Sequence, residues 1–189
     1  MNKMIVEYIE NIFDDNFNST LSQELLDSKL WAISKDNVGD DTNGIFGKLS
    51  DKYSDSGLLI LSLSETGNVP PIERLNVSAY YIYRSIIKNS KYNFINASVK
   101  RVLWNYYNRS SHGVTHTDSP QSNYYSILYN INDNDGATVI NDERIDAKAG
   151  SCVIFKSNSI HYGVGPTKAK NKLAVNIIFS ADGHELKNE

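Results

Sequence analysis

The chain has 189 residues, which is enough for one domain with a buried core and short for two. Its composition, 40% hydrophobic and 22% charged, is that of a globular protein, and no apolar run approaches the roughly 20 residues of a membrane span. With 19 basic and 22 acidic residues the net charge is -3, which does not favour binding to nucleic acid. We therefore expect neither a membrane nor a nucleic-acid partner.

The cysteine content and the first residues predict the compartment. Cys152 is the only cysteine and cannot form an internal disulfide. Residues 1–15 carry acidic side chains where a secretory signal would need a basic end and an uninterrupted apolar stretch. We therefore expect a reducing, cytoplasmic location. Nothing in the sequence indicates an oligomeric state.

Three stretches in the first half of the chain have the three- and four-residue apolar spacing of amphipathic helices. They are residues 4–12, residues 21–31, which follow a predicted cap at Asn18 or Ser19, and residues 77–88. Helices with one apolar face must bury that face. We expect all three to pack against another layer of the fold.

Two segments lie between the predicted helices. Residues 35–55 are rich in Asp, Asn, Gly and Ser and predict a long irregular loop, which could act as a lid. Residues 57–64 contain a short apolar run that predicts a strand.

From residue 94 onward, short β-branched and aromatic runs alternate with turn residues, a pattern typical of strands. The predicted strands are 98–107, 114–118, 124–132, 137–141, 145–147, 152–155, 161–164 and 172–180. About eight strands at this spacing predict a jelly-roll double sheet. We therefore predict a mainly β single domain over residues 1–189, with a helical buttress and loop region at 1–93 and the β core at 94–182.

The triplet His116-Thr117-Asp118, followed by His161, is the strongest chemical signal in the chain. In an extended strand residues i and i+2 point the same way, so His116 and Asp118 can reach one metal ion. Two imidazoles and one carboxylate bind iron(II) on one face and leave positions open for other ligands. We predict His116, Asp118 and His161 as metal ligands; the alternative is that the histidines are core or surface residues and the triplet a chance match.

Residues 106–180 resemble the double-stranded β-helix core of the iron(II)/2-oxoglutarate-dependent dioxygenases, and are most similar to the prolyl 4-hydroxylase-like group. The likeness is carried by Tyr106-Tyr107, His116-Thr117-Asp118, Tyr129-Asn130-Ile131-Asn132, Asp135-Gly136-Ala137-Thr138, Lys148-Ala149-Gly150, Cys152-Val153-Ile154-Phe155, His161, Gly165-Pro166 and Asn171-Lys172. The ordered set is more specific than any one of its motifs.

The chain departs from the family pattern in three places. Asp135-Gly136 stands where the family usually has Gly-Gly, and residues 108–111 replace a glycine- or proline-containing loop. The first hundred residues match no motif. The departures leave the mouth of the site and the substrate surface undefined.

The resemblance implies a dioxygenase that uses Fe(II) with 2-oxoglutarate and O2 as co-substrates, and it allows a requirement for ascorbate. Such enzymes hydroxylate an unactivated C–H bond and release succinate and CO2. The group suggests a peptidyl prolyl or small amino-acid-like substrate, so the expected partner is a small molecule or a peptide. Lys172 occupies the place of the basic residue that pairs with the 5-carboxylate of 2-oxoglutarate.

Two more residues are predicted to bind the co-substrate. Asn176 shares a strand face with Lys172. Tyr106 and Tyr107 point to opposite faces of their strand, so at most one lines the pocket. We prefer Tyr106, which shares a face with Trp104, although either tyrosine could instead be an aromatic core residue.

Three other readings are compatible with parts of the sequence. A cupin-type barrel also binds metal through histidines but needs no basic residue after the last one. A nucleic-acid demethylase of the same superfamily would be expected to show late arginines and a basic groove, yet no arginine follows Arg144. An inactive barrel would serve only as an interaction module, a role that the intact ligand triad disfavours.

Overall fold

The computed structural model of the protein describes residues 5–27, 32–33, 59–62 and 73–188. The helices in this part are α1 (Asp15–Asp27) and α2 (Glu73–Asn89). Its strands are β1 (Ile5–Ile9), β2 (Ala32–Ile33), β3 (Leu59–Ser62), β4 (Tyr92–Ile95), β5 (Ser98–Asn108), β6 (Tyr124–Asn130), β7 (Ala137–Ile140), β8 (Glu143–Asp146), β9 (Cys152–Lys156), β10 (His161–Val164), β11 (Asn171–Ser180) and β12 (Gly183–Leu186).

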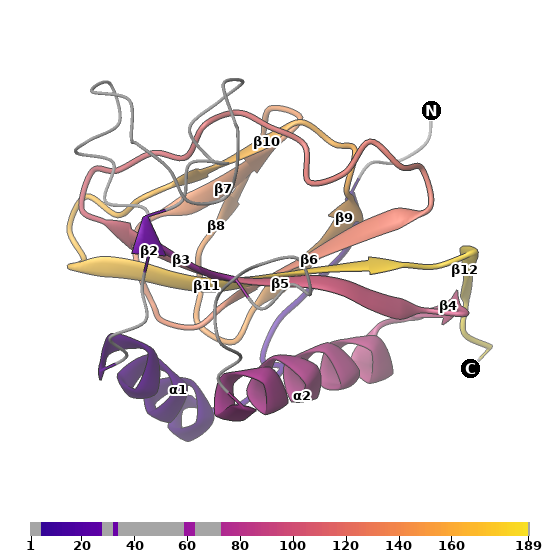
Figure 1. Cartoon of the computed structure of the whole chain (residues 1–189), viewed down its shortest axis with the longest axis horizontal. Helices are drawn as coiled ribbons and strands as arrows, with labels where there is room; N and C mark the ends of the chain where they lie inside the picture. Colours follow the sequence, from indigo (N-terminus) through magenta and orange to yellow (C-terminus); the bar gives the residue numbers. More distant parts are fainter. Residues whose placement is uncertain (1–4, 28–31, 34–58, 63–72, 189) are drawn as a thin grey trace.

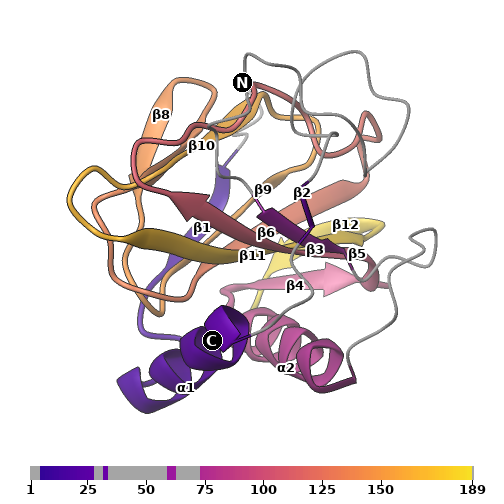
Figure 2. The ribbon, with the colours of Figure 1, turned by 60° about the vertical axis from the view of Figure 1, so that its left-hand side comes forward.

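The described strands form one large and two small antiparallel sheets. The main sheet has seven strands in the order β1-β9-β6-β11-β5-β3-β2, and the small sheets are β10-β7-β8 and β12-β4. Figure 1 shows three layers, with α1 and α2 under the main sheet and β7, β8 and β10 above it, and Figure 2 shows the same layers from the side. The fold is therefore mainly β, with helices covering one face.

Strand β11 runs through the middle of the main sheet, and its side chains alternate between two different surroundings. Leu173, Val175 and Ile177 belong to the large apolar core, which also contains Leu25 of α1 and Ile82 of α2. The residues between them line a cavity on the opposite face of the sheet. The two-residue period of a strand thus separates a packing face from a site face.

The helix predicted over residues 4–12 is wrong, because residues 5–9 form β1 at the edge of the main sheet, with Tyr8 opposite Val153 of β9. Over a short run, apolar spacing alone does not distinguish a helix from a strand, and here pairing with β9 decides. Helix α1 begins at Asp15, earlier than expected. Asp14 caps it by accepting a hydrogen bond from the Phe17 amide (2.8 Å).

The predicted helix at 77–88 is confirmed within α2, and the strands predicted after residue 94 are confirmed except for 114–118. The predicted boundary at residue 93 does not separate the helical region from the β core completely. Strands β1, β2 and β3 precede it and belong to the main sheet, and β4 spans it. The predicted loop at 35–55 lies outside the described residues.

Strand β12 was not predicted, and it contains His184. The Nδ1 atom of His184 forms a hydrogen bond with the Tyr125 hydroxyl (3.0 Å). In the described part of the chain, neither helix is long and apolar enough to cross a membrane.

The docking of α2 on the main sheet provides a test of the fold. Ile82 is fully buried, whereas Val77 on the same helix is 69% exposed. We expect Ile82→Ala to lower the free energy of unfolding by about 2–5 kcal/mol, because it removes apolar contacts and leaves a cavity. Val77→Ala should change it by less than about 1 kcal/mol. Urea denaturation followed by circular dichroism measures both; equal effects would contradict the packing described here.

Candidate functional site

The two histidines of the predicted triad are joined through the backbone. His116 lies in the connection between β5 and β6, and His161 begins β10. Each donates its amide N–H to the other's carbonyl oxygen at 2.9 Å, and the ring centroids are 4.4 Å apart. This bridge stands where a strand was predicted at 114–118, and within those residues only His116 has a β-type pairing.

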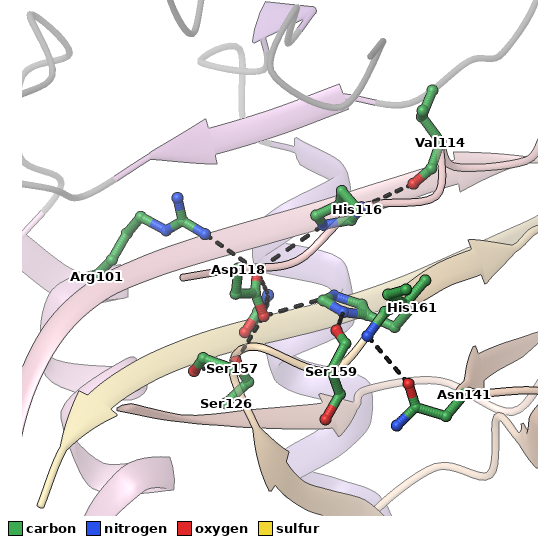
Figure 3. A network of polar contacts seen from close by, with 11 residues as sticks. Arg101, Val114, His116, Asp118, Ser126, Asn141, Ser157, Ser159 and His161 are labelled. Atoms are coloured by element: carbon green, nitrogen blue, oxygen red, sulfur yellow. Dashed lines mark hydrogen bonds and ion pairs between the residues drawn. The ribbon is translucent and has the colours of Figure 1, made fainter. Parts of the chain in front are cut away.

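Asp118 completes the group. The donor atoms of His116, Asp118 and His161 all lie within 4.8 Å of one another, and within the described residues they form a set that could hold a metal ion. The Nε2 atoms of His161 and His116 lie 3.5 and 3.9 Å from the Asp118 carboxylate oxygens. The convergence that the spacing predicted is therefore present (Figure 3).

Hydrogen bonds to the backbone orient both imidazoles for metal binding. Nδ1 of His116 donates to the Val114 carbonyl (2.7 Å), and Nδ1 of His161 donates to the Ser159 carbonyl (3.0 Å). A carbonyl oxygen only accepts, so each Nδ1 carries a proton, and Nε2 is the nitrogen that has the lone pair when the ring is neutral. Burial, with the nearby His161, lowers the pKa of His116 and favours the neutral ring that a metal requires.

Three strands hold the Asp118 carboxylate. Ser126 of β6 donates a hydrogen bond at 2.6 Å, Asn176 of β11 donates to both oxygens at 3.0 and 3.1 Å, and Arg101 of β5 donates at 3.1 Å. Burial would raise the pKa of Asp118, but His161 and Arg101 outweigh that effect and the pKa lies below its ordinary value. The side chain therefore stays anionic and fixed in place.

A cavity extends from the triad between the main sheet and the small sheet, with a volume of about 480 Å³ including the part that opens to solvent. Its lining residues are Leu103, Asn105, Tyr107, His116, Asp118, Leu128, Thr138, Phe155, His161, Gly163, Lys172, Ala174 and Asn176. The cavity therefore brings together the triad, Lys172 and Asn176.

Lys172 is a buried cation in this cavity, with only 1% of its surface exposed. Its ammonium group donates to the Ala137 carbonyl and to the Thr138 hydroxyl (3.2 Å), and it lies 5.1 Å from the centre of the Tyr107 ring. No carboxylate pairs with it among the described residues. Burial, with a smaller effect of Arg144, lowers its pKa to about 7.

The preference for Tyr106 over Tyr107 was wrong. Tyr106 packs against the large apolar core, together with Trp104, whereas Tyr107 lines the cavity. We had inferred that the face shared with Trp104 was the pocket face, but it is the face covered by the helices. The Tyr107 ring also packs against the backbone of Gly163, where an added Cβ would lie 2.3 Å from the Tyr107 oxygen.

Sequence reasoning missed three polar residues of the site. Arg101 and Ser126 bind the Asp118 carboxylate, and Asn105 lines the cavity. Asn176, expected to bind the co-substrate, donates to Asp118, and its side-chain oxygen is buried with no hydrogen-bond partner among the described residues. The alternation along β5 could have grouped Arg101 and Asn105 with Tyr107, had the pocket face been known.

The departure at Asp135-Gly136 has a structural explanation. The Asp135 carboxylate accepts hydrogen bonds from the amides of Thr167, Lys168 and Ala169, which hold its pKa well below the ordinary value. A Cβ on Gly136 would lie 2.6 Å from the Val164 carbonyl oxygen. This pair fixes the loop that leads into β11.

No protein-family model and no curated protein matches the sequence. Solved structures do match. A viral collagen prolyl hydroxylase from Paramecium Bursaria Chlorella virus-1, solved with 2-oxoglutarate, is 13% identical, with 95% of this chain and 97% of that chain covered and a TM-score of 0.61. A Trichoplax adhaerens prolyl hydroxylase, in complex with a hypoxia inducible factor peptide, is 14% identical, covering 96% and 85%, with a TM-score of 0.62.

The α-ketoglutarate-dependent epimerase SnoN of nogalamycin biosynthesis is 8% identical, covering 96% and 80%, with a TM-score of 0.59. These structures share their fold with this chain over nearly its whole length. The resemblance to the iron(II)/2-oxoglutarate dioxygenases, including prolyl hydroxylases, is thus confirmed at the level of the fold.

The triad is testable by metal binding alone. We expect wild-type protein to bind one equivalent of Mn(II), and His116→Ala, Asp118→Ala or His161→Ala to weaken binding at least about tenfold, because each removes a ligand. Isothermal titration calorimetry measures the affinity. His112→Ala is the matched control, since His112 is exposed and outside the triad. Unchanged Mn(II) affinity in a triad variant would remove that residue from the ligand set.

Proposed function

We propose that the protein is an Fe(II)- and 2-oxoglutarate-dependent dioxygenase that hydroxylates an unactivated C–H bond and releases succinate and CO2. In this proposal the main sheet and the small sheet are the two halves of a double-stranded β-helix, or jelly roll. His116, Asp118 and His161 would hold the iron. Two imidazoles and one carboxylate are a donor set that suits ferrous iron and leaves positions open.

The observation that carries the proposal is that the Lys172 ammonium lies in the same cavity as the triad and has no carboxylate partner among the described residues. A buried ammonium without a counter-ion costs free energy, and a bound carboxylate would offset that cost. Because Lys172 and the triad line one space, a ligand with a carboxylate at each end could reach both. 2-Oxoglutarate has this form, with a 2-oxo acid group for the metal and a 5-carboxylate for the ammonium.

Bound iron would supply the activation of O2, and the protein residues would bind, orient and exclude water. Ser126 and Asn176 fix the Asp118 carboxylate, so little rearrangement is needed when the metal enters. Tyr107 lines the same space as Lys172, and a tyrosine hydroxyl can donate a hydrogen bond to a carboxylate. Leu128 and Phe155 supply apolar walls.

The open side of the site is the side of His116, whose side chain is 28% exposed whereas that of His161 is 6% exposed. The substrate would therefore approach past His116. By analogy with the prolyl hydroxylases of the same fold, we propose a peptidyl prolyl or a small amino-acid-like substrate. A cupin-type barrel without 2-oxoglutarate chemistry would supply no carboxylate to offset the cost of burying Lys172.

Co-substrate turnover tests the proposal. We expect wild-type protein with Fe(II) to convert 2-oxoglutarate to succinate, slowly without a substrate and faster with one. Lys172→Ala should raise the apparent KM for 2-oxoglutarate at least about tenfold, because a buried charge pair is lost. Lys170→Ala, a neighbouring exposed lysine, is the matched control. Succinate is measured by chromatography against prolyl peptides and free amino acids.

Oxygen- and iron-independent succinate formation, or none with any of these substrates, would contradict the proposed activity. If turnover is present but Lys172→Ala and Lys170→Ala behave alike, then Lys172 is not the co-substrate anchor.

The lowered pKa of Lys172 predicts that co-substrate binding is linked to protonation. With a pKa of about 7 in the free protein, Lys172 is largely neutral at pH 8.5, whereas a bound carboxylate favours the ammonium form. Binding at pH 8.5 should therefore take up a proton, and the dissociation constant should rise by up to about tenfold per pH unit above pH 7. Calorimetry of the Mn(II)-loaded protein in buffers of different ionisation enthalpy measures this uptake. No uptake in wild type, or the same uptake in Lys172→Met, would contradict the assignment.

A further inference from the structure

Arg101 lies on the same strand face as Tyr107 but at the other end of the site. In the pairing of β5 with β11, Tyr107 is opposite Lys172 and Arg101 is opposite Ile178. Asn176, which binds Asp118, lies between these two positions on β11. The two cations of the site are thus on opposite sides of the Asp118 carboxylate, with Lys172 buried and Arg101 30% exposed.

The Arg101 guanidinium has unused hydrogen-bonding capacity. It carries five N–H donors, and its described contact is one bond from Nη2 to Asp118 at 3.1 Å. Its Nε is buried and has no hydrogen-bond partner among the residues that the structure describes. Figure 3 shows the second terminal nitrogen pointing away from Asp118. A buried donor without an acceptor costs free energy unless a ligand satisfies it.

The charge of Arg101, like its free donors, favours a bound anionic group. Within the described residues, Asp118 is the carboxylate that pairs with Arg101. A metal ion held by His116, Asp118 and His161 would bind the same carboxylate, so the carboxylate would compensate less of the guanidinium's positive charge. The side of the site away from Lys172 would then favour an anionic group. A guanidinium fork fits a carboxylate in geometry, and with one donor already on Asp118 it suits a monoanion.

We propose that Arg101 binds a carboxylate of the substrate that is hydroxylated. This inference rests on the proposed function and narrows its substrate class to carboxylic acids whose reacting C–H lies near the acid group. A free amino acid, or the last residue of a peptide, has such a group. A prolyl residue inside a peptide chain does not.

The test compares acids with their amides in protein that cannot turn over. Protein loaded with Zn(II) and 2-oxoglutarate is titrated with L-proline and L-prolinamide, N-acetyl-L-proline and N-acetyl-L-prolinamide, and L-leucine and L-leucinamide, with binding followed by NMR. In at least one pair we expect wild type to bind the acid at least about tenfold more tightly than the amide. Arg101→Gln should lose this preference, and Arg101→Lys should retain part of it.

Lys100→Gln is the matched control, because it removes an exposed charge from the neighbouring position of β5. It should keep the preference of wild type. Zn(II) affinity is measured for each variant, so that damage to the triad is detected separately.

Wild-type protein that binds acid and amide equally, or binds neither member of every pair, would overturn the inference. So would a preference that persists in Arg101→Gln, or one that Lys100→Gln also loses. Failure of the proposed function has a different signature, the absence of Fe(II)-dependent conversion of 2-oxoglutarate to succinate by wild type. If wild type forms succinate with Fe(II) but binds acids and amides equally, the proposed activity stands and only the role of Arg101 is refuted.

Discussion

The alternation of side chains along β11 is the constraint on which both the fold and the site depend. Leu173, Val175 and Ile177 bind the sheet to its helices, and the intervening Lys172 and Asn176 face the cavity. A shift of one residue in the pairing of β11 would bury the ammonium among apolar side chains and remove the anchor of the carboxylate. Core packing therefore fixes the register that the chemistry needs.

The charged groups of the site differ in how many hydrogen-bond and ion-pair partners the protein supplies. The Asp118 carboxylate receives hydrogen bonds from three strands and stays anionic. Within the described residues, the Lys172 ammonium donates to a carbonyl and a hydroxyl but to no carboxylate. The Arg101 Nε has no acceptor there. A protein tolerates such costs where a ligand removes them. Under the proposed function, these cations supply two anion positions, one on each side of the metal site.

Errors in the sequence interpretation arose where a pattern had two readings. The apolar residues of 5–9 fit a helix or an edge strand, and only pairing with β9 decided. The alternation along β5 correctly separated Tyr106 from Tyr107, but a two-residue period does not say which face is covered by helices. Arg101 carried no signal in the sequence, because its role depends on a contact with Asp118, 17 residues away.

Chemical identity and local spacing were determined by the sequence alone. The triplet His116-Thr117-Asp118, the later His161 and the shared face of Lys172 and Asn176 follow from residue type and strand period. The tertiary structure decided which strand faces look toward each other, because that depends on the order of strands in the sheets and on the layer that covers each face. The two-residue period tells which side chains share a face of a strand. Only the pairing of strands far apart in the sequence decides whether that face looks toward the site or toward the helices.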